Sequence, residues 1–160
     1  MVVDIGAGAG GVFDKYIANN KIGKVLSIEP NQEFAQEFER RRAQLKRPEQ
    51  FKLLLAGGED SKAIIEAAQD FFPSDLADND LNICFHISLS FFWQSKAMLA
   101  KLAKTIALFE DFYYQRKGKG RVKIVYLTIE GERLNQLLSQ ERGSVKLNKI
   151  VLRQINQNKI

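Results

Sequence analysis

Cysteine and histidine are almost absent from this sequence, and Cys84 and His86 are the single residues of each type. A lone cysteine excludes an internal disulfide and a cysteine-rich metal site. A lone histidine excludes the usual zinc centres and argues against a Ser-His-Asp triad. The sequence therefore predicts no metal site, and we expect any chemistry to depend on a bound cofactor and on the positioning of the reactants.

Long hydrophobic runs are also lacking. No apolar run approaches the roughly 20 residues of a membrane span, and the first residues lack the basic and apolar regions of a signal peptide. We therefore expect a cytoplasmic protein with no membrane partner. The chain has 160 residues, of which 45% are hydrophobic, and this suffices for one core, so a single domain over residues 1–160 is predicted.

Acidic residues are outnumbered by basic ones. The chain has 24 Lys and Arg against 19 Asp and Glu, which gives a net charge of +5. A solvated basic surface and a polyanionic partner such as RNA both explain this balance. The basic residues gather in two clusters, neither of which alternates with aromatic residues as a platform for single-stranded bases does. The clusters are Arg40, Arg41, Arg42, Lys46 and Arg47, and Arg116, Lys117, Lys119 and Arg121.

The chain alternates expected strands with expected helices. This alternation, with nearly continuous apolar strands, predicts an α/β fold with a mostly parallel sheet and helices on both faces. The carboxyl ends of the strands then share one rim. Phe34, Phe38 and Leu45 are spaced for one buried helix face, and Asp60 or Ser61 can cap a helix that stops before Pro73. Strands are expected at residues 1–5, 24–28, 51–55, 81–88, 122–129 and 145–155, and the other helices at 12–20, 31–45, 94–114 and 130–140.

The most informative stretch is residues 2–11, Val-Val-Asp-Ile-Gly-Ala-Gly-Ala-Gly-Gly, in which a strand with an acid, Asp4, leads into a glycine loop. Glycine permits positive φ and has no Cβ, so a ligand can lie against the backbone, and the next helix offers free N–H groups. Gly6, Gly8 and Gly11 satisfy the dinucleotide pattern G-x-G-x-x-G. The acid before the glycines is typical of S-adenosylmethionine methyltransferases, whose first motif this stretch resembles. Alternatively, Asp4 caps the N–H groups of the loop.

Two later strand ends carry further candidates. Glu29 follows the second strand, where a carboxylate can accept hydrogen bonds from both hydroxyls of a ribose. The alternative is a solvated acid. The third strand leads into Gly58-Glu59-Asp60. In methyltransferases this turn borders the adenine, so Glu59 and Asp60 are candidates, and the alternative for Asp60 is helix capping alone.

The end of the fourth strand joins polar side chains to three consecutive aromatic residues, Phe91, Phe92 and Trp93. These rings either belong to the core or stack on a flat base, an interaction worth roughly 1–3 kcal/mol.

Taken in order, several segments resemble one family. They are Val-Val-Asp-Ile-Gly-Ala-Gly-Ala-Gly-Gly, Ser-Ile-Glu-Pro-Asn, Ala-Gly-Gly-Glu-Asp-Ser, Ser-Leu-Ser-Phe-Phe-Trp-Gln-Ser and Leu-Thr-Ile-Glu-Gly-Glu-Arg-Leu. The series is similar to the guanine-N7 methyltransferase domain of mRNA capping enzymes, especially those of large cytoplasmic DNA viruses.

The resemblance implies a Rossmann-like methyltransferase fold and S-adenosylmethionine as cofactor. Its implied partners are capped RNA and other domains or subunits of a capping enzyme, in the host cytoplasm or the virion. His86 would border the methionine part of the cofactor, although a strand-end histidine with a hydrogen-bond partner is the alternative. The implied cofactor-binding residues are Asp4, Gly6, Ala7, Gly8, Glu29, Pro30, Gly58, Glu59, Asp60, Phe85 and His86. The implied substrate-binding residues are Ser90, Phe91, Phe92, Trp93 and Glu130.

The mechanism implied by the family needs no catalytic residue. The N7 atom of the cap guanine attacks the methyl group of the cofactor in line, and proximity, orientation and electrostatics favour the reaction. The chain departs from the family at Ser90 and Phe91, where many cellular members have a His-Tyr pair. The family's segment before the first strand and its last strand are not evident, so we expect a fold truncated at both ends, as in a fragment of a longer protein.

Other functions stay open at this point. The same fold could methylate another substrate, or the chain could be a non-catalytic subunit that binds RNA or a partner. A nicotinamide-dependent dehydrogenase is disfavoured, because no substrate domain or hydride-transfer site is recognisable.

Overall fold

A computed structural model describes residues 1–127, 144–147 and 150–153 of the chain. The chain forms two compact units, Met1–Leu127 and Thr128–Ile160. The first unit contains nearly all of the predicted site residues. The single domain expected over residues 1–160 stays a prediction.

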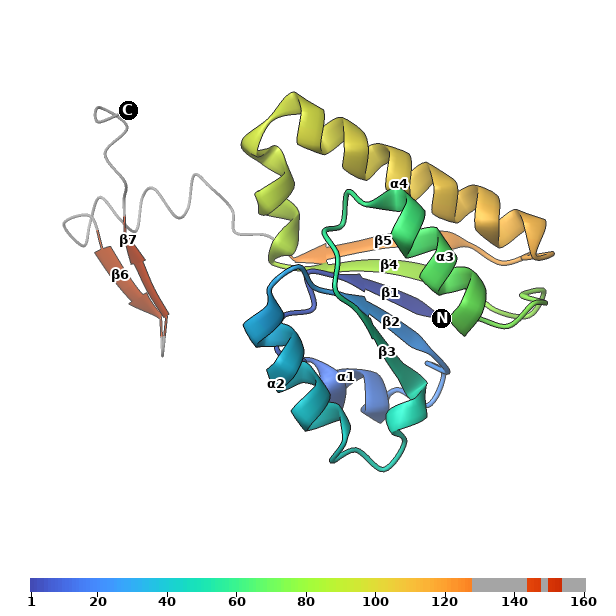
Figure 1. Cartoon of the computed structure of the whole chain (residues 1–160), viewed down its shortest axis with the longest axis horizontal. Coiled ribbons are helices and arrows are strands. Elements are labelled where there is room, and N and C mark those ends of the chain that lie inside the picture. Colours follow the sequence, from blue (N-terminus) through green and yellow to red (C-terminus); the bar gives the residue numbers. More distant parts are fainter. Residues whose placement is uncertain (128–143, 148–149, 154–160) are drawn as a thin grey trace. The chain divides into compact units, whose positions relative to one another are not determined.

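The first unit is built on a five-stranded sheet (Figure 1). Its strands pair in parallel in the order β3-β2-β1-β4-β5. The chain thus adds β2 and β3 on one side of β1, and β4 and β5 on the other. Such a reversal leaves a crevice at the carboxyl ends of the two strands where it occurs, here β1 and β4. The strands are β1 (Val2–Ile5), β2 (Val25–Ile28), β3 (Phe51–Leu54), β4 (Leu81–His86) and β5 (Val122–Leu127).

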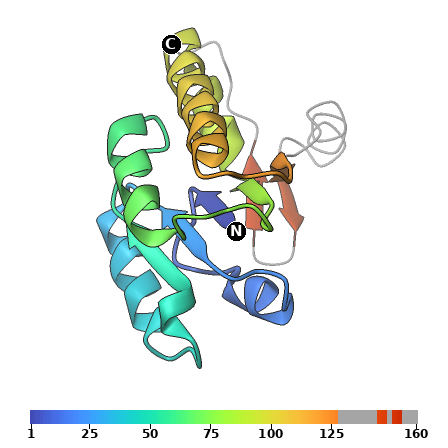
Figure 2. The same cartoon turned by 90° about the vertical axis from the view of Figure 1, so that its right-hand side faces the viewer.

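Helices cover both faces of this sheet, as Figure 1 and Figure 2 show from two directions. α1 (Phe13–Ala18) and α2 (Gln32–Arg42) lie on one face, and α3 (Ser61–Phe71) and α4 (Lys96–Gln115) on the other. Two short 3-10 helices, η1 (Pro48–Gln50) and η2 (Ser88–Gln94), precede β3 and follow β4. The protein therefore has an α/β Rossmann-like fold, as the strand–helix alternation predicts.

Side chains of the sequence explain where three of the helices begin. Asn31 accepts hydrogen bonds from the N–H groups of Glu33 and Phe34 and so caps α2. Asp60 caps α3 by accepting from the N–H of Ala63, and Ser95 caps α4 by accepting from that of Met98. Each cap satisfies a backbone donor that the helix itself leaves free. The capping predicted for Asp60 is confirmed.

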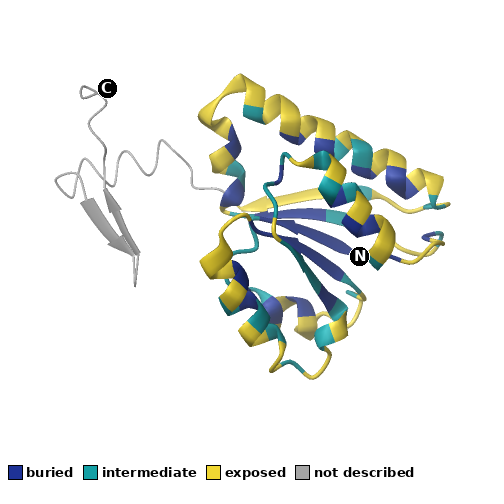
Figure 3. Ribbon diagram, in the orientation of Figure 1, coloured by how far each residue is buried: buried dark blue, intermediate teal, exposed yellow. Residues whose placement is uncertain are grey.

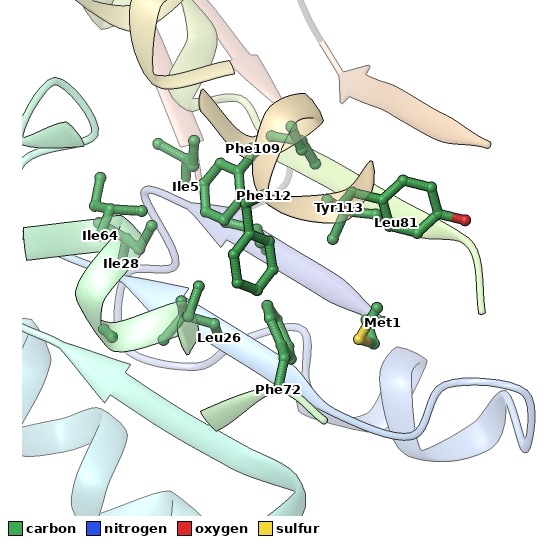
Figure 4. Packing of buried hydrophobic residues seen from close by; sticks show 14 of the residues in the cluster. Met1, Ile5, Leu26, Ile28, Ile64, Phe72, Leu81, Phe109, Phe112 and Tyr113 are labelled. Carbon is green, nitrogen blue, oxygen red and sulfur yellow. The ribbon is translucent and has the colours of Figure 1, made fainter. Parts of the chain in front are cut away.

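The core lies in two layers because alternate residues of each strand face opposite sides of the sheet. Odd-numbered residues of β1, such as Ile5, pack with α3 and α4, and Figure 4 shows aromatic rings of α4, Phe109 and Phe112, among the aliphatic residues of this layer. The other layer centres on the ring of Phe13, which lies edge-on to those of Phe38 and Phe51 at 4.6 and 4.7 Å between ring centres. The central strands are thus buried on both faces (Figure 3).

The structure corrects several expectations about single elements. Phe34 is 48% exposed, because α2 turns Phe38 rather than Phe34 toward the core. The fourth strand ends at His86, so Ser88 belongs to η2.

The expected strand at residues 145–155 is instead two strands, β6 (Ser144–Leu147) and β7 (Ile150–Arg153), which pair antiparallel. Apolar residues lie on both sides of the break, so their pattern did not reveal it. The helix expected at 130–140 lies outside the described residues. Among the helices of the described part of the chain, none is both long and apolar enough to cross a membrane.

Candidate functional site

The loop after β1 lies at the carboxyl rim of the sheet and is fixed by hydrogen bonds to β2. The N–H groups of Gly6 and Ala7 both donate to the carbonyl oxygen of Ile28, at 2.9 and 3.1 Å. The N–H of Gly8 donates to the Glu29 carboxylate at 2.8 Å. Three amides that could otherwise bind an anion are therefore engaged within the protein.

The glycines of this loop serve different purposes. Gly6, Gly8 and Gly10 have φ of +76°, +57° and +74°, which disfavour any side chain. A Cβ at Gly6 would also overlap Ser88, whereas a Cβ at Gly8 would meet no atom within 4 Å. Gly6 thus lets η2 approach β1, and Gly8 leaves backbone open for a ligand.

Glu29 is buried at the end of β2, with 6% of its surface exposed. Its two carboxylate oxygens accept from the N–H of Gly8 at 2.8 Å and from the N–H of Asn31 at 2.9 Å. The alternative of a solvated acid is therefore wrong. Because each carboxylate oxygen has a second lone pair, Glu29 can still accept from hydroxyl groups of a ligand.

Asp4 is the most unusual group of the site. It is 1% exposed, lies in register between Ser27 and Cys84, and neither carboxyl oxygen has a hydrogen-bond partner among the described residues. Its alternative role as a cap of the glycine loop is thus not observed. Burial raises the pKa of Asp4 to about 7, while the Tyr16 hydroxyl opposes the rise and the Glu29 carboxylate adds to it.

Tyr16 is a site residue that the sequence did not reveal. Its ring is buried on α1, and its hydroxyl is hydrogen-bonded to Nε2 of His86 at 2.9 Å. Burial, helped by the charge of Lys15, lowers the pKa of His86 and so favours its neutral form. His86 is therefore a histidine with a hydrogen-bond partner, and its contact with a cofactor stays a prediction. The only signal for Tyr16 was its place one helical turn after the glycine loop.

The turn after β3 combines packing and capping roles. Gly58 is buried, and a Cβ there would come within 2.5 Å of Ile5 and 2.7 Å of Phe92, so glycine is needed for packing. The carboxylate of Glu59 folds over the backbone of Gly57. Asp60 caps α3, and Pro30, the neighbour of Glu29, is exposed.

The segment after β4 divides the predicted aromatic residues into two groups. Phe92 is buried against Phe85, with 6.3 Å between the ring centres, so neither ring is free to contact a ligand. This corrects the expectation of base stacking for Phe92, and Phe85 can reach a cofactor through its backbone alone. Phe91 and Trp93 are 65% and 57% exposed.

The backbone between β4 and η2 is strained. Ile87 has a φ of +69°, which is rare for a β-branched residue. The hydroxyl of Ser88 donates to the carbonyl oxygen of Ile5, and that of exposed Ser90 donates to the carbonyl oxygen of Ile87 at 3.2 Å. η2 is thereby joined to the end of β1, next to the glycine loop. Glu130, the last predicted substrate residue, lies outside the described residues.

Comparisons with known sequences and with solved structures give different outcomes. No family model and no curated protein matches the sequence. Among solved structures, the chain is similar to an rRNA methylase from Streptococcus thermophilus, with 15% identity, a TM-score of 0.43, and coverage of 97% of this chain and 87% of that one. Similarity at this level says nothing of substrate or activity.

Proposed function

We propose that the protein is an S-adenosylmethionine-dependent methyltransferase that transfers a methyl group to N7 of the guanine cap of mRNA. The observation that carries the proposal is the pairing of Glu29 with Gly8. A buried carboxylate with free lone pairs lies beside a glycine whose outer side is open. A nucleoside whose ribose hydroxyls meet Glu29 can therefore rest against the backbone of Gly8.

The state of the loop amides favours this cofactor over a dinucleotide. A pyrophosphate is bound by free N–H groups at a helix N-terminus. In this loop the amides of Gly6, Ala7 and Gly8 donate to Ile28 and Glu29. The helix that follows, α1, has six residues and hence a small dipole. A ligand without phosphate suits such a loop.

The charge of the site also suits a sulfonium cofactor. Asp4 and Glu29 are both buried near the loop, and Glu29 is close enough to raise the pKa of Asp4. A cation at the site relieves this repulsion between carboxylates. S-adenosylmethionine carries such a positive charge at the sulfur, and that charge is lost on methyl transfer.

An aromatic acceptor is supported by the exposed rings after β4. Large apolar side chains exposed beside a ligand site often bind a partner, and Phe91 and Trp93 offer faces on which a base can stack. The guanine cap of RNA is the acceptor implied by the resemblance of the sequence. Other domains or subunits of a capping enzyme are the proposed partners. The protein's own groups would bind and orient the acceptor, and no side chain need take part in the transfer.

Methyl transfer to matched RNAs tests this acceptor. Wild-type protein is incubated with labelled S-adenosylmethionine and with RNA that bears either a guanine cap or a 5′-triphosphate. We expect label in the capped RNA alone, at N7 after digestion to nucleosides. Label in both RNAs, or at another base, overturns the cap assignment but retains the methyltransferase. Binding of the cofactor without transfer to either RNA contradicts the enzymatic role.

A further inference from the structure

A second concave surface lies apart from the glycine loop. It is a groove of about 960 Å³ on the face of the sheet that bears α1. Of the predicted site residues that the structure describes, only His86 lines it. Asn82 and Cys84 of β4 and Val125 of β5 form part of its floor, and Val125 is 47% exposed. Figure 3 shows that β5 is exposed along most of its length.

Lysines line both sides of this groove. Lys15 and Lys21 lie on the side of α1 and the loop after it, and Lys119 and Lys123 lie at β5 and the turn before it. The carboxylates in the lining are those of Asp78 and Asp80, and Asp80 is paired with Lys123. Lys15, Lys21 and Lys119 make no ion pair with any residue that the structure describes.

The basic clusters recognised in the sequence are used differently. Arg40 and Arg41 both pair with Glu37, and Arg42 pairs with Glu39, so this part of α2 is largely neutralised. Arg116 donates to backbone carbonyl groups of Gln69, Phe72 and Pro73. Lys119 of the second cluster lies in the groove, where it joins Lys15 and Lys21 as lysines without an ion pair among the described residues.

From this arrangement we infer that the groove holds the sugar–phosphate backbone of the acceptor RNA, an inference that rests on the proposed RNA methyltransferase function. Lysines contact phosphates without regard to sequence, and the side chains of Asn19, Asn79 and Asn82 offer hydrogen bonds to sugars. The groove extends to His86 at the carboxyl end of β4, the rim at which the glycine loop lies. One end of an RNA in the groove thus reaches the rim that bears the proposed cofactor site, and the proposed cap acceptor makes this the 5′ end.

A charge-removal experiment tests this path. The variant K15Q/K21Q/K119Q removes the three groove lysines that have no ion pair within the described part of the chain. The matched control K62Q/K101Q/K104Q removes three exposed lysines of α3 and α4, on the other face of the sheet. Binding of a fluorescent 20-nucleotide single-stranded RNA is measured by anisotropy at several salt concentrations. Each phosphate contact contributes about 0.7 to the magnitude of the slope of log K against log salt concentration. The slope of the groove variant should therefore be smaller in magnitude by about 2, and the variant should bind RNA roughly 100-fold more weakly at 0.1 M salt.

The control variant should bind RNA within about twofold of wild type, because charges more than about 10 Å away are screened. Equal losses in the two variants, or no RNA binding by wild type, overturn the groove proposal. A third outcome is that wild type forms a dimer and binds no RNA, and that the groove variant is monomeric. This outcome assigns the surface to a second copy of the chain and also overturns the groove proposal. Thermal unfolding of every variant checks that it is folded.

A separate titration of the same protein preparations with S-adenosylhomocysteine tests the proposed function. Failure of that titration counts against the methyltransferase, whereas RNA binding by wild type with equal losses in the two variants counts against the groove alone.

Discussion

At the scale of single residues, the carboxyl group of Asp4 stands out because its burial is only partly offset by the nearby Tyr16 hydroxyl. The group is 1% exposed and has no hydrogen-bond partner among the described residues, and its pKa is raised to about 7. Burying an acid without a partner lowers stability. Buried charged or polar groups without partners are found most often at functional sites. The position of Asp4 on the strand before the glycine loop is consistent with such a site.

The raised pKa of Asp4 makes stability depend on pH. Because the folded-state pKa is about 7 and the ordinary value is 3.8, the folded protein binds more protons than the unfolded chain between these values. Its free energy of unfolding therefore falls as pH rises from about 4 to about 7, and this loss persists above pH 7. Asp4→Asn should remove the fall. At pH 8 the variant should be more stable than wild type by roughly 1–3 kcal/mol. The raised pKa of Asp4 destabilises wild type by about 4 kcal/mol at this pH, and burying an amide without a partner offsets part of that gain in the variant.

Urea unfolding at pH 4.5 and pH 8 measures this difference. Asp14→Asn is the matched control, because Asp14 is exposed on α1 and its substitution changes the same group at the surface. If Asp4→Asn keeps the pH dependence of wild type, or is less stable at pH 8, then Asp4 is not the buried, strained acid described above.

At the scale of elements, hydrophobic periodicity predicted most strands and helices, and the errors have physical causes. Expected strands at 24–28 and 51–55 became Val25–Ile28 and Phe51–Leu54, since apolar runs mark buried strands well. Periodicity could not tell Phe34, which is exposed, from Phe38, which is buried. It also could not separate Phe92 from its exposed neighbours Phe91 and Trp93, because a 3-10 turn has no long repeat to read.

The turn between β3 and α3 supplies a test of packing. Gly58→Ala places a methyl group within 2.5 Å of Ile5 and 2.7 Å of Phe92, and such overpacking should cost about 1–3 kcal/mol. Gly57→Ala is the control, because its Cβ would meet only the flexible end of Glu59. In thermal unfolding, the midpoint temperature of Gly58→Ala should be well below that of Gly57→Ala. Equal stability with weaker S-adenosylhomocysteine binding by Gly58→Ala would instead assign Gly58 to the cofactor site.

At the scale of the whole molecule, the sheet order brings together residues that are far apart in the sequence. The order β3-β2-β1-β4-β5 places the glycine loop, Glu29 and η2 at one rim. The motif at residues 2–11 and the strand end at Glu29 predicted that meeting. The contact of Tyr16 with His86 could not be predicted, since it joins residues 70 apart and depends on how α1 lies on the sheet. The lysine groove also depends on tertiary structure, because its lysines come from two separate segments.

The central claim is that Glu29 and Gly8 hold the nucleoside of S-adenosylmethionine, and calorimetric titration tests it most directly. Wild-type protein should bind S-adenosylhomocysteine and should not bind NAD. Glu29→Gln should weaken binding by roughly 10- to 100-fold, because hydrogen bonds to a charged group contribute about 1.5–3 kcal/mol. Glu59→Gln, at a half-buried carboxylate of the neighbouring turn, supplies the comparison and should weaken binding less. Binding of NAD in place of S-adenosylhomocysteine, or equal affinities of wild type and Glu29→Gln, would contradict the account.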